Sequence, residues 1–283
     1  MFVKRFDWVR SRFFPHTFDH CRTTLHLQAA LPTPTREALA QVIGQASIAK
    51  RVSKPLECLH SRLFVKRERL DSLRKKWRIQ RGVRKRNGLF DWSLEELINT
   101  REANLRGARV PKLKGYGYSH SALGLPEHFY LLIEHLEDHI DGYNWVMQQP
   151  QRVNELIETA FELLHSLHGR GVSHMDLWAG NLMLPVKGNQ PAQAVDLENC
   201  FVTPTNHFTE VLAFQIGFFY YRQVYRFITE TEYDALVEDA LKRYFTNVQR
   251  DLFDRIYAIA KHQDVGRLER RDIFHSGKLQ ARW

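Results

Sequence analysis

The sequence contains few cysteines and no long uninterrupted apolar run. Its three cysteines, Cys21, Cys58 and Cys200, are scattered, odd in number and in no metal-ligand spacing, so we expect neither a disulfide framework nor a structural zinc site. The longest apolar runs, such as Tyr130–Ile133 and Val211–Tyr221, are too short or too interrupted to cross a bilayer. These features favour a cytoplasmic protein in a reducing compartment.

The N-terminal segment also lacks the apolar core of a secretory signal, because charged residues interrupt it. Phe2, Phe6, Val9 and Phe13 instead recur at helical spacing among basic residues. This pattern predicts a basic amphipathic helix over Met1–Phe14, which either lies on a membrane surface or packs on the body of the protein.

Acidic residues are scarce in one stretch of the chain. From Lys66 to Arg86 eleven residues are basic and only Glu68 and Asp71 are acidic, so this stretch carries a charge equal to the formal net charge of the whole chain, +9. A concentrated basic face attracts anionic polymers, anionic membranes or phosphorylated ligands. The same pattern fits an ordinary solvated helix face. No nucleic-acid recognition motif accompanies it, which argues against nucleic acid as the partner.

The patterning of the chain changes near Glu134. Strand-like runs and turn signals dominate the part before it, and the part after it is largely helical. The strongest helical repeat runs from Val153 to His168 and stops at Gly169-Arg170-Gly171. We therefore predict an α+β, two-lobed protein, with a β-rich N-terminal lobe over residues 1–133 and a helical C-terminal lobe over residues 134–283.

The N-terminal lobe is expected to contain one main helix. Ser93-Leu94-Glu95-Glu96 has the form of a capping box that opens it. Further along, Glu102 falls on the same face as Leu94, Ile98 and Leu105. A carboxylate in an apolar stripe needs a partner if it is buried, so Glu102 is a candidate functional residue.

The strongest chemical signal is His174-Met175-Asp176-Leu177-Trp178-Ala179-Gly180-Asn181-Leu182, followed by Val195-Asp196-Leu197-Glu198. The first run has the H-x-D-L-x-x-x-N pattern of a phosphoryl-transfer catalytic loop. Phosphoryl transfer needs a carboxylate that orients the attacking hydroxyl and accepts its proton, and oxygen ligands that hold Mg²⁺ across the phosphates. Asp176 suits the first task. Asn181 and Asp196 suit the second, since Mg²⁺ prefers hard oxygen donors.

The run from Leu164 to Leu177 resembles the helix and catalytic loop of the bacterial lipopolysaccharide core sugar kinases, which phosphorylate Kdo or heptose. This family has the protein-kinase-like fold, and aminoglycoside phosphotransferases and RIO kinases are its relatives. The resemblance covers roughly residues 60 to 220. It implies a kinase that uses ATP and Mg²⁺, with a sugar or lipid-linked saccharide as acceptor, working at the inner face of the cytoplasmic membrane.

The resemblance also implies roles for residues ahead of the loop. Lys66, in the run L-F-V-K-R, is similar to the family's strand-borne lysine, which holds the α- and β-phosphates. Glu102, in R-E-A-N-L, is similar to the glutamate that pairs with that lysine. Glu134 and Leu136 are expected on the hinge, with their backbone groups facing adenine.

Several parts of the wider pattern are missing. Only Gly44, within Ile43–Ser47, stands where a glycine-rich loop is expected. Met175 replaces the arginine of H-R-D, and Leu197-Glu198 replaces F-G. No A-P-E run follows Asp196, so the activation loop of regulated protein kinases is not expected. This favours a sugar or small-molecule hydroxyl over a protein as the acceptor.

Three hypotheses stay open at this point. The chain is a kinase acting on a lipid-linked saccharide, a kinase acting on a protein or a soluble small molecule, or a catalytically weak regulatory protein of the same fold. A scaffold would have no need of a complete set of catalytic residues, which argues against the third hypothesis. That set comprises Lys66, Glu102, Asp176, Asn181 and Asp196.

Overall fold

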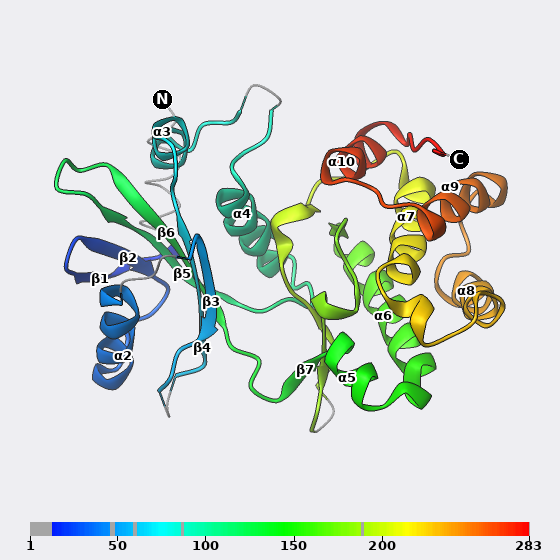
Figure 1. Cartoon of the computed structure of the whole chain (residues 1–283), viewed down its shortest axis with the longest axis horizontal. Coiled ribbons are helices and arrows are strands. Elements are labelled where there is room, and N and C mark those ends of the chain that lie inside the picture. The colour runs from blue at the N-terminus through cyan, green and yellow to red at the C-terminus, as the bar shows by residue number, and fades with distance from the viewer. Residues whose placement is uncertain (1–12, 46–48, 59–60, 86–87, 188–189, 283) are drawn as a thin grey trace. The chain divides into compact units, whose positions relative to one another are not determined.

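The computed structural model of the chain describes residues 13–45, 49–58, 61–85, 88–187 and 190–282 (Figure 1). The predicted helix over Met1–Phe14 lies outside this set except for Phe13 and Phe14. None of the helices formed by the described residues is long and apolar enough to span a membrane.

The described residues form two compact units. One extends to Arg101 and also contains Pro111–Glu137, and the other contains Glu102–Val110 and the chain from Asp138 onward. Residues 102–110, which begin within one helix, therefore belong to the second unit. The sequence pattern predicted a single boundary, between residues 133 and 134.

An antiparallel sheet of six strands forms the first unit, in the order β1-β2-β5-β6-β4-β3. Its strands are β1 (His16–His20), β2 (Thr23–Leu27), β3 (Arg51–Pro55), β4 (Leu63–Arg69), β5 (Leu113–His120) and β6 (Pro126–Glu134). The helices that accompany it are α2 (Thr33–Gly44), α3 (Leu73–Arg81) and α4 (Trp92–Leu105).

Apolar clusters on both faces of the sheet explain the continuous hydrophobic run of β6, from Phe129 to Ile133. Along β6, Leu131 points into a cluster with Leu94 of α4, whereas Leu132 points into a separate cluster with Leu39 of α2. Successive side chains of a strand point to opposite faces, so each face is covered by its own helix. In β4, Val65 lies in the α2 cluster, and its neighbour Lys66 is thereby directed to the face that carries α4.

The second unit is mainly helical. Its helices are α5 (Gly142–Gln148), α6 (Val153–Gly169), α7 (Phe208–Tyr221), α8 (Glu230–Tyr244), α9 (Arg250–His262) and α10 (Arg267–Ser276). Its short strands are β7 (His139–Asp141), β8 (Ser173–His174), β9 (Leu182–Pro185), β10 (Gln193–Ala194) and β11 (Cys200–Phe201). They form a three-stranded sheet in the order β10-β9-β7 and a β11-β8 pair.

The core of this unit lies between its helices. The predicted apolar face of α6, from Val153 to Leu167, is buried along its whole length. α7 is buried on almost every side and packs against α9 and α10 (Figure 1). The prediction of an α+β protein with a β-rich first part and a helical second part is confirmed.

Candidate functional site

The predicted catalytic loop occupies the turn between β8 and β9. β8 pairs with β11, His174 lying opposite Cys200, and the N–H of Met175 donates to the carbonyl oxygen of Asn199 at 3.0 Å. Met175 is fully buried in the core. An apolar side chain here anchors the loop, which explains why the arginine of H-R-D can be absent. Asp176, the next residue, is 9% exposed.

His174 joins this loop to the run that carries Asp196. Its Nε2 lies 2.9 Å from the carbonyl oxygen of Val195, which can only accept, so Nε2 carries the proton. The backbone N–H of Asp176 donates to Nδ1 at 3.3 Å. Burial lowers the pKa of His174. The neutral ring therefore ties the Asp176 backbone to the segment leading to Asp196.

Asn181 has its amide orientation set by the loop. Its Nδ2 donates to the carbonyl oxygen of Asp176 at 2.9 Å, which turns Oδ1 the other way. Its own carbonyl oxygen accepts from the N–H of Val195 at 2.9 Å. The side-chain oxygen of Asn181 is thus the atom that could bind a cation.

Asp196 has an unusual backbone conformation. Its φ of 64° and ψ of 62° place it in the left-handed region, which non-glycine residues seldom adopt. Such conformations persist where the surroundings hold them and are concentrated at functional sites. Together with Asn181, Asp196 gives the second unit two oxygen-bearing side chains that are joined through Val195.

A residue that the sequence did not single out contacts the predicted base. Nη1 of Arg270, on α10, donates to Oδ1 of Asp176 at 2.5 Å. Burial lowers the pKa of the Arg270 guanidinium, and the Asp176 charge opposes that effect. No local pattern could reveal this pair, because 94 residues separate its members.

In the first unit, Lys66 forms an ion pair with Glu96. Lys66 Nζ lies 2.5 Å from Glu96 Oε1, and both side chains are largely buried. Glu102 is six residues farther along α4, about 9 Å along the helix axis and about 240° around it. The structure thus gives Lys66 a partner that the sequence did not single out, and its pairing with Glu102 stays a prediction.

The sequence pattern placed Glu96 in a capping box at the start of the helix, and therefore gave it no role at the site. α4 begins at Trp92, so Ser93 lies within its first turn, and its hydroxyl donates to Glu68 of β4. One turn later Glu96 meets Lys66 of the same strand. Ser93 and Glu96 thus contact the sheet, and the predicted apolar stripe ends at Leu105, which is 57% exposed.

The predicted hinge residues lie at the end of β6 and after it. The N–H of Glu134 donates to the carbonyl oxygen of Lys112 at 2.8 Å. Its N–H is therefore engaged within the protein and not available to a ligand. Leu136 is partly buried. Gly44 is the last residue of α2, and the last two residues of the run expected to form a glycine-rich loop, Ala46 and Ser47, lie outside the described residues.

A minority of the eleven cations in the basic stretch is neutralised within the first unit. Four of its cations form ion pairs with carboxylates of that unit: Lys66 with Glu96, Lys75 with Glu68, and Arg78 and Lys85 with Asp91. The outward face of α3 combines exposed arginines with two exposed apolar side chains, Leu73 at 70% and Trp77 at 49%. The stretch therefore carries less free charge than its composition indicates.

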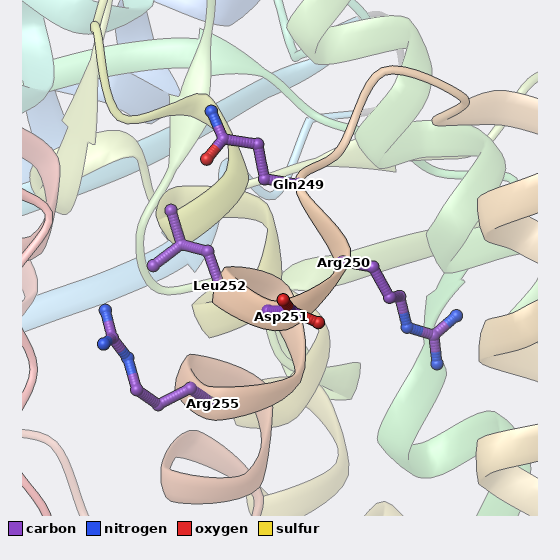
Figure 2. A pocket seen from close by; sticks show the side chains of 5 residues that line it. All are labelled: Gln249, Arg250, Asp251, Leu252 and Arg255. Carbon is purple, nitrogen blue, oxygen red and sulfur yellow. The ribbon is translucent and has the colours of Figure 1, made fainter.

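A hollow of about 430 Å³ lies at the start of α9. Its lining residues are Gln249, Arg250, Asp251, Leu252 and Arg255. Figure 2 shows the two arginine side chains pointing to opposite sides. Arg250 is held by ion pairs with Glu238 and Asp254. No predicted site residue lines this hollow, so we assign it no part in the site.

A chain of hydrogen bonds from α6 and α7 supports the catalytic loop. Nε2 of Gln215, on α7, donates to the carbonyl oxygen of His174 at 3.2 Å, and its Oε1 lies 2.7 Å from Nε2 of His168. Because the amide oxygen accepts, Nε2 of His168 carries a proton and donates it to this bond. Burial lowers the pKa of His168 to about 4.

This low pKa predicts a loss of stability in acid. An unfolded histidine has a pKa near 6.5, so the contribution of His168 is complete above about pH 6.5 and disappears as the pH falls towards 4. Its upper limit is about 3 kcal/mol, from 1.36 kcal/mol per pKa unit, and partial exposure of His168 reduces it. Urea unfolding at pH 7 and pH 4.5 should show a smaller acid loss in His168→Gln. His16→Gln, on an exposed strand position, is the control, and equal losses in both variants would contradict the prediction.

Comparison with known proteins places these residues in a family. The model of the lipopolysaccharide kinase (Kdo/WaaP) family matches residues 59–210, which is more than half of the 283 residues. This range includes Lys66, Glu96, Asp176, Asn181 and Asp196 but ends before α10.

The other comparisons add little to the family match. A solved structure described as "WaaP in complex with acyl carrier protein" is similar at 16% identity and a TM-score of 0.46, covering 74% of this chain and 80% of that one. These values are too low to support any statement about the site. No curated protein sequence matches the chain.

Proposed function

Because this chain belongs to the lipopolysaccharide kinase (Kdo/WaaP) family, whose members are phosphotransferases with hydroxyl acceptors, we propose that it transfers the γ-phosphoryl group of ATP to a sugar hydroxyl of the lipopolysaccharide core, on Kdo or heptose. The carrying observation is the loop between β8 and β9. It presents Asp176 and Asn181 from a backbone held at Met175 and His174.

Asp176 is the proposed general base. The acceptor hydroxyl gives its proton to a carboxylate oxygen of Asp176 while its oxygen forms a bond to the γ-phosphorus. The bond between that phosphorus and the β–γ bridging oxygen breaks, and ADP leaves with the electron pair. Arginine cannot take up the proton because it stays protonated, so Arg270 cannot replace Asp176 in this step.

The donor set fits a magnesium ion. Asn181 Oδ1 is turned away from the loop by the bond from Nδ2 to Asp176, and Asp196 supplies a carboxylate. Both are hard oxygen ligands of the kind Mg²⁺ prefers. When bound there, Mg²⁺ would neutralise charge on the phosphate oxygens. The two side chains would hold the ion, and no sulfur or imidazole ligand is needed.

The first unit supplies the groups proposed to bind the nucleotide. Glu96 holds Lys66 by a short ion pair, which orients the ammonium group for the α- and β-phosphates. The carbonyl oxygen of Glu134 and the N–H of Leu136 are the backbone groups proposed to meet adenine.

The experiment that tests this function is turnover of ATP and Mg²⁺ against a panel of acceptors. The panel contains a deacylated core oligosaccharide with Kdo and heptose, a lipid A precursor, a generic protein and water. We expect the core oligosaccharide to be phosphorylated fastest. Faster phosphorylation of the protein would favour the alternative acceptor class, and no turnover with any of them would overturn the proposal.

We further propose that the enzyme works at the inner face of the cytoplasmic membrane, with α3 as the contact. Leu73 and Trp77 are four residues apart and lie on one exposed face of this helix. Arg74 and Arg81 are exposed beside them, and the Arg81 guanidinium lies 5.5 Å from the Trp77 ring centroid. A helix with apolar and basic side chains on its outer surface suits the interface of an anionic bilayer.

Reversing this charge should release the protein from anionic vesicles. Each basic side chain near an anionic surface contributes about 1 kcal/mol, so the double variant Arg74→Glu/Arg81→Glu should bind phosphatidylglycerol vesicles at least about tenfold more weakly at low salt. Co-sedimentation across a salt series measures it, with phosphatidylcholine vesicles for comparison. Arg243→Glu reverses an exposed arginine on α8 and serves as the control. Equal binding of the two variants would contradict the role of α3.

A further inference from the structure

The C-terminal helix α10 reaches the catalytic loop through a buried arginine. Arg270 is 6% exposed and donates to Asp176 Oδ1 at 2.5 Å. Its Nε donates to the carbonyl oxygen of Val265 at 2.8 Å. Its guanidinium carbon lies 4.2 Å from the centroid of the Phe218 ring on α7. These contacts fix the guanidinium plane before any substrate arrives.

Two other arginines of α10 contact residues close to Asp196 in the chain. Arg267 Nη1 lies 2.6 Å from Oε1 of the buried Glu198, and the Arg271 guanidinium carbon lies 5.5 Å from the Phe201 ring centroid. The helix therefore contacts the loop that holds the base and also the segment that follows Asp196. It lies more than fifty residues beyond the end of the family match.

The bond from Arg270 restricts the geometry of the Asp176 carboxylate. With Oδ1 engaged by Arg270, Oδ2 is the carboxylate oxygen without a hydrogen-bond donor among the described residues. A general base must lie within hydrogen-bond reach of the hydroxyl it deprotonates. A fixed Oδ1 leaves only one oxygen for that task and limits rotation of the carboxylate.

We propose that Arg270 is a positioning residue for phosphoryl transfer, which holds the Asp176 carboxylate so that Oδ2 accepts the proton of the acceptor hydroxyl. The inference rests on the proposed function, in which Asp176 is the base. Arg270 acts through Asp176 and touches neither the acceptor nor the transferred phosphoryl group in this role. Lysine is a poor substitute, because only arginine can engage Val265 and Asp176 with two nitrogens of one plane.

Turnover of ATP with the core oligosaccharide, with ATP hydrolysis measured alongside, tests the proposal. Arg270→Ala should lower kcat by about tenfold to a hundredfold, as expected for loss of a charge-assisted hydrogen bond. The KM for ATP should change less than about threefold, because Arg270 belongs to catalysis and not to nucleotide binding. Arg270→Lys should recover little. Guanidinium added at millimolar concentration should raise the kcat of Arg270→Ala and leave that of the wild type unchanged.

The control separates positioning from simple stabilisation of the C-terminal segment. Arg282, in the segment after α10, pairs with Glu269 of that helix, so Arg282→Ala loosens this segment without touching Asp176. If Arg270→Ala kept full kcat, or lost it without guanidinium rescue and to the same extent as Arg282→Ala, the inference would be overturned.

Asp176→Asn distinguishes this failure from failure of the proposed function. Normal turnover in Asp176→Asn would show that Asp176 is not the base, and it would overturn the proposed mechanism. An inactive Asp176→Asn beside a fully active Arg270→Ala would overturn the positioning role alone. Guanidinium rescue of Arg270→Ala in an enzyme that Asp176→Asn inactivates is the result that supports the proposal.

Discussion

Replacing Asp176 with asparagine is expected to lower kcat by about a hundredfold or more, because general-base catalysis contributes about 10²- to 10⁴-fold. Asparagine keeps an oxygen that can accept from Arg270, so the buried guanidinium retains a partner. ATP affinity should stay within about threefold of the wild type, since the base acts in the transition state. Steady-state kinetics and nucleotide binding measured on the same preparation check both parts.

Asp176→Ala is a harsher version of the same change. It removes both the base and the partner of Arg270, and breaking a buried ion pair costs about 3–5 kcal/mol of stability. A thermal melt should therefore separate the alanine and asparagine variants, although both lose activity. Asp141→Ala is a matched control. Asp141 caps α5 and has no catalytic role, so this variant should lose stability and keep its kcat. An Asp176→Asn enzyme with wild-type kcat would show that another group accepts the proton.

Substitutions of Lys66 and Glu96 should have the second-largest effect on activity. Lys66→Met is expected to lower kcat/KM for ATP on the order of tenfold to a hundredfold, since a hydrogen bond to a charged group contributes about 1.5–3 kcal/mol. Glu96→Gln should lower it less, because the amide oxygen can still accept from the ammonium group. Glu102→Gln should leave it within about threefold.

A double-mutant cycle decides whether Lys66 and Glu96 act together. Once the lysine is gone, Glu96 has no ammonium group to orient, so Lys66→Met/Glu96→Gln should be scarcely worse than Lys66→Met alone. Strict additivity of the two losses would mean that the residues act independently. A large loss in Glu102→Gln with none in Glu96→Gln would restore the partner predicted from the sequence.

The catalytic loop was predictable because its residues are neighbours in the chain. Asp176 and Asn181 are five positions apart, and the loop, the helix α6 ahead of it and the strand after it are all local features. The sheet was also predictable in kind, since strand-like runs and turn signals recur before Glu134. Its order, with β6 between β5 and β4, depends on pairings between distant segments.

The partner of Lys66 could not be read from the helix alone. Glu96 and Glu102 are both carboxylates on α4, and a motif match with an apolar stripe favoured the second. The choice depends on where the helix begins and on which turn lies over β4. Ser93 bonded to Glu68 sets that register, and it is a contact between elements that no local pattern encodes.

By itself, the sequence determined the residues of the catalytic loop, the helical second part and the family. Short-range spacing and side-chain chemistry carry that information. The tertiary structure decided which carboxylate holds Lys66, how much of the basic stretch is neutralised, and that Arg270 meets Asp176. Each of these is an electrostatic contact between residues far apart in the chain, and packing of α4, α3 and α10 onto their neighbours is what brings the charges within reach.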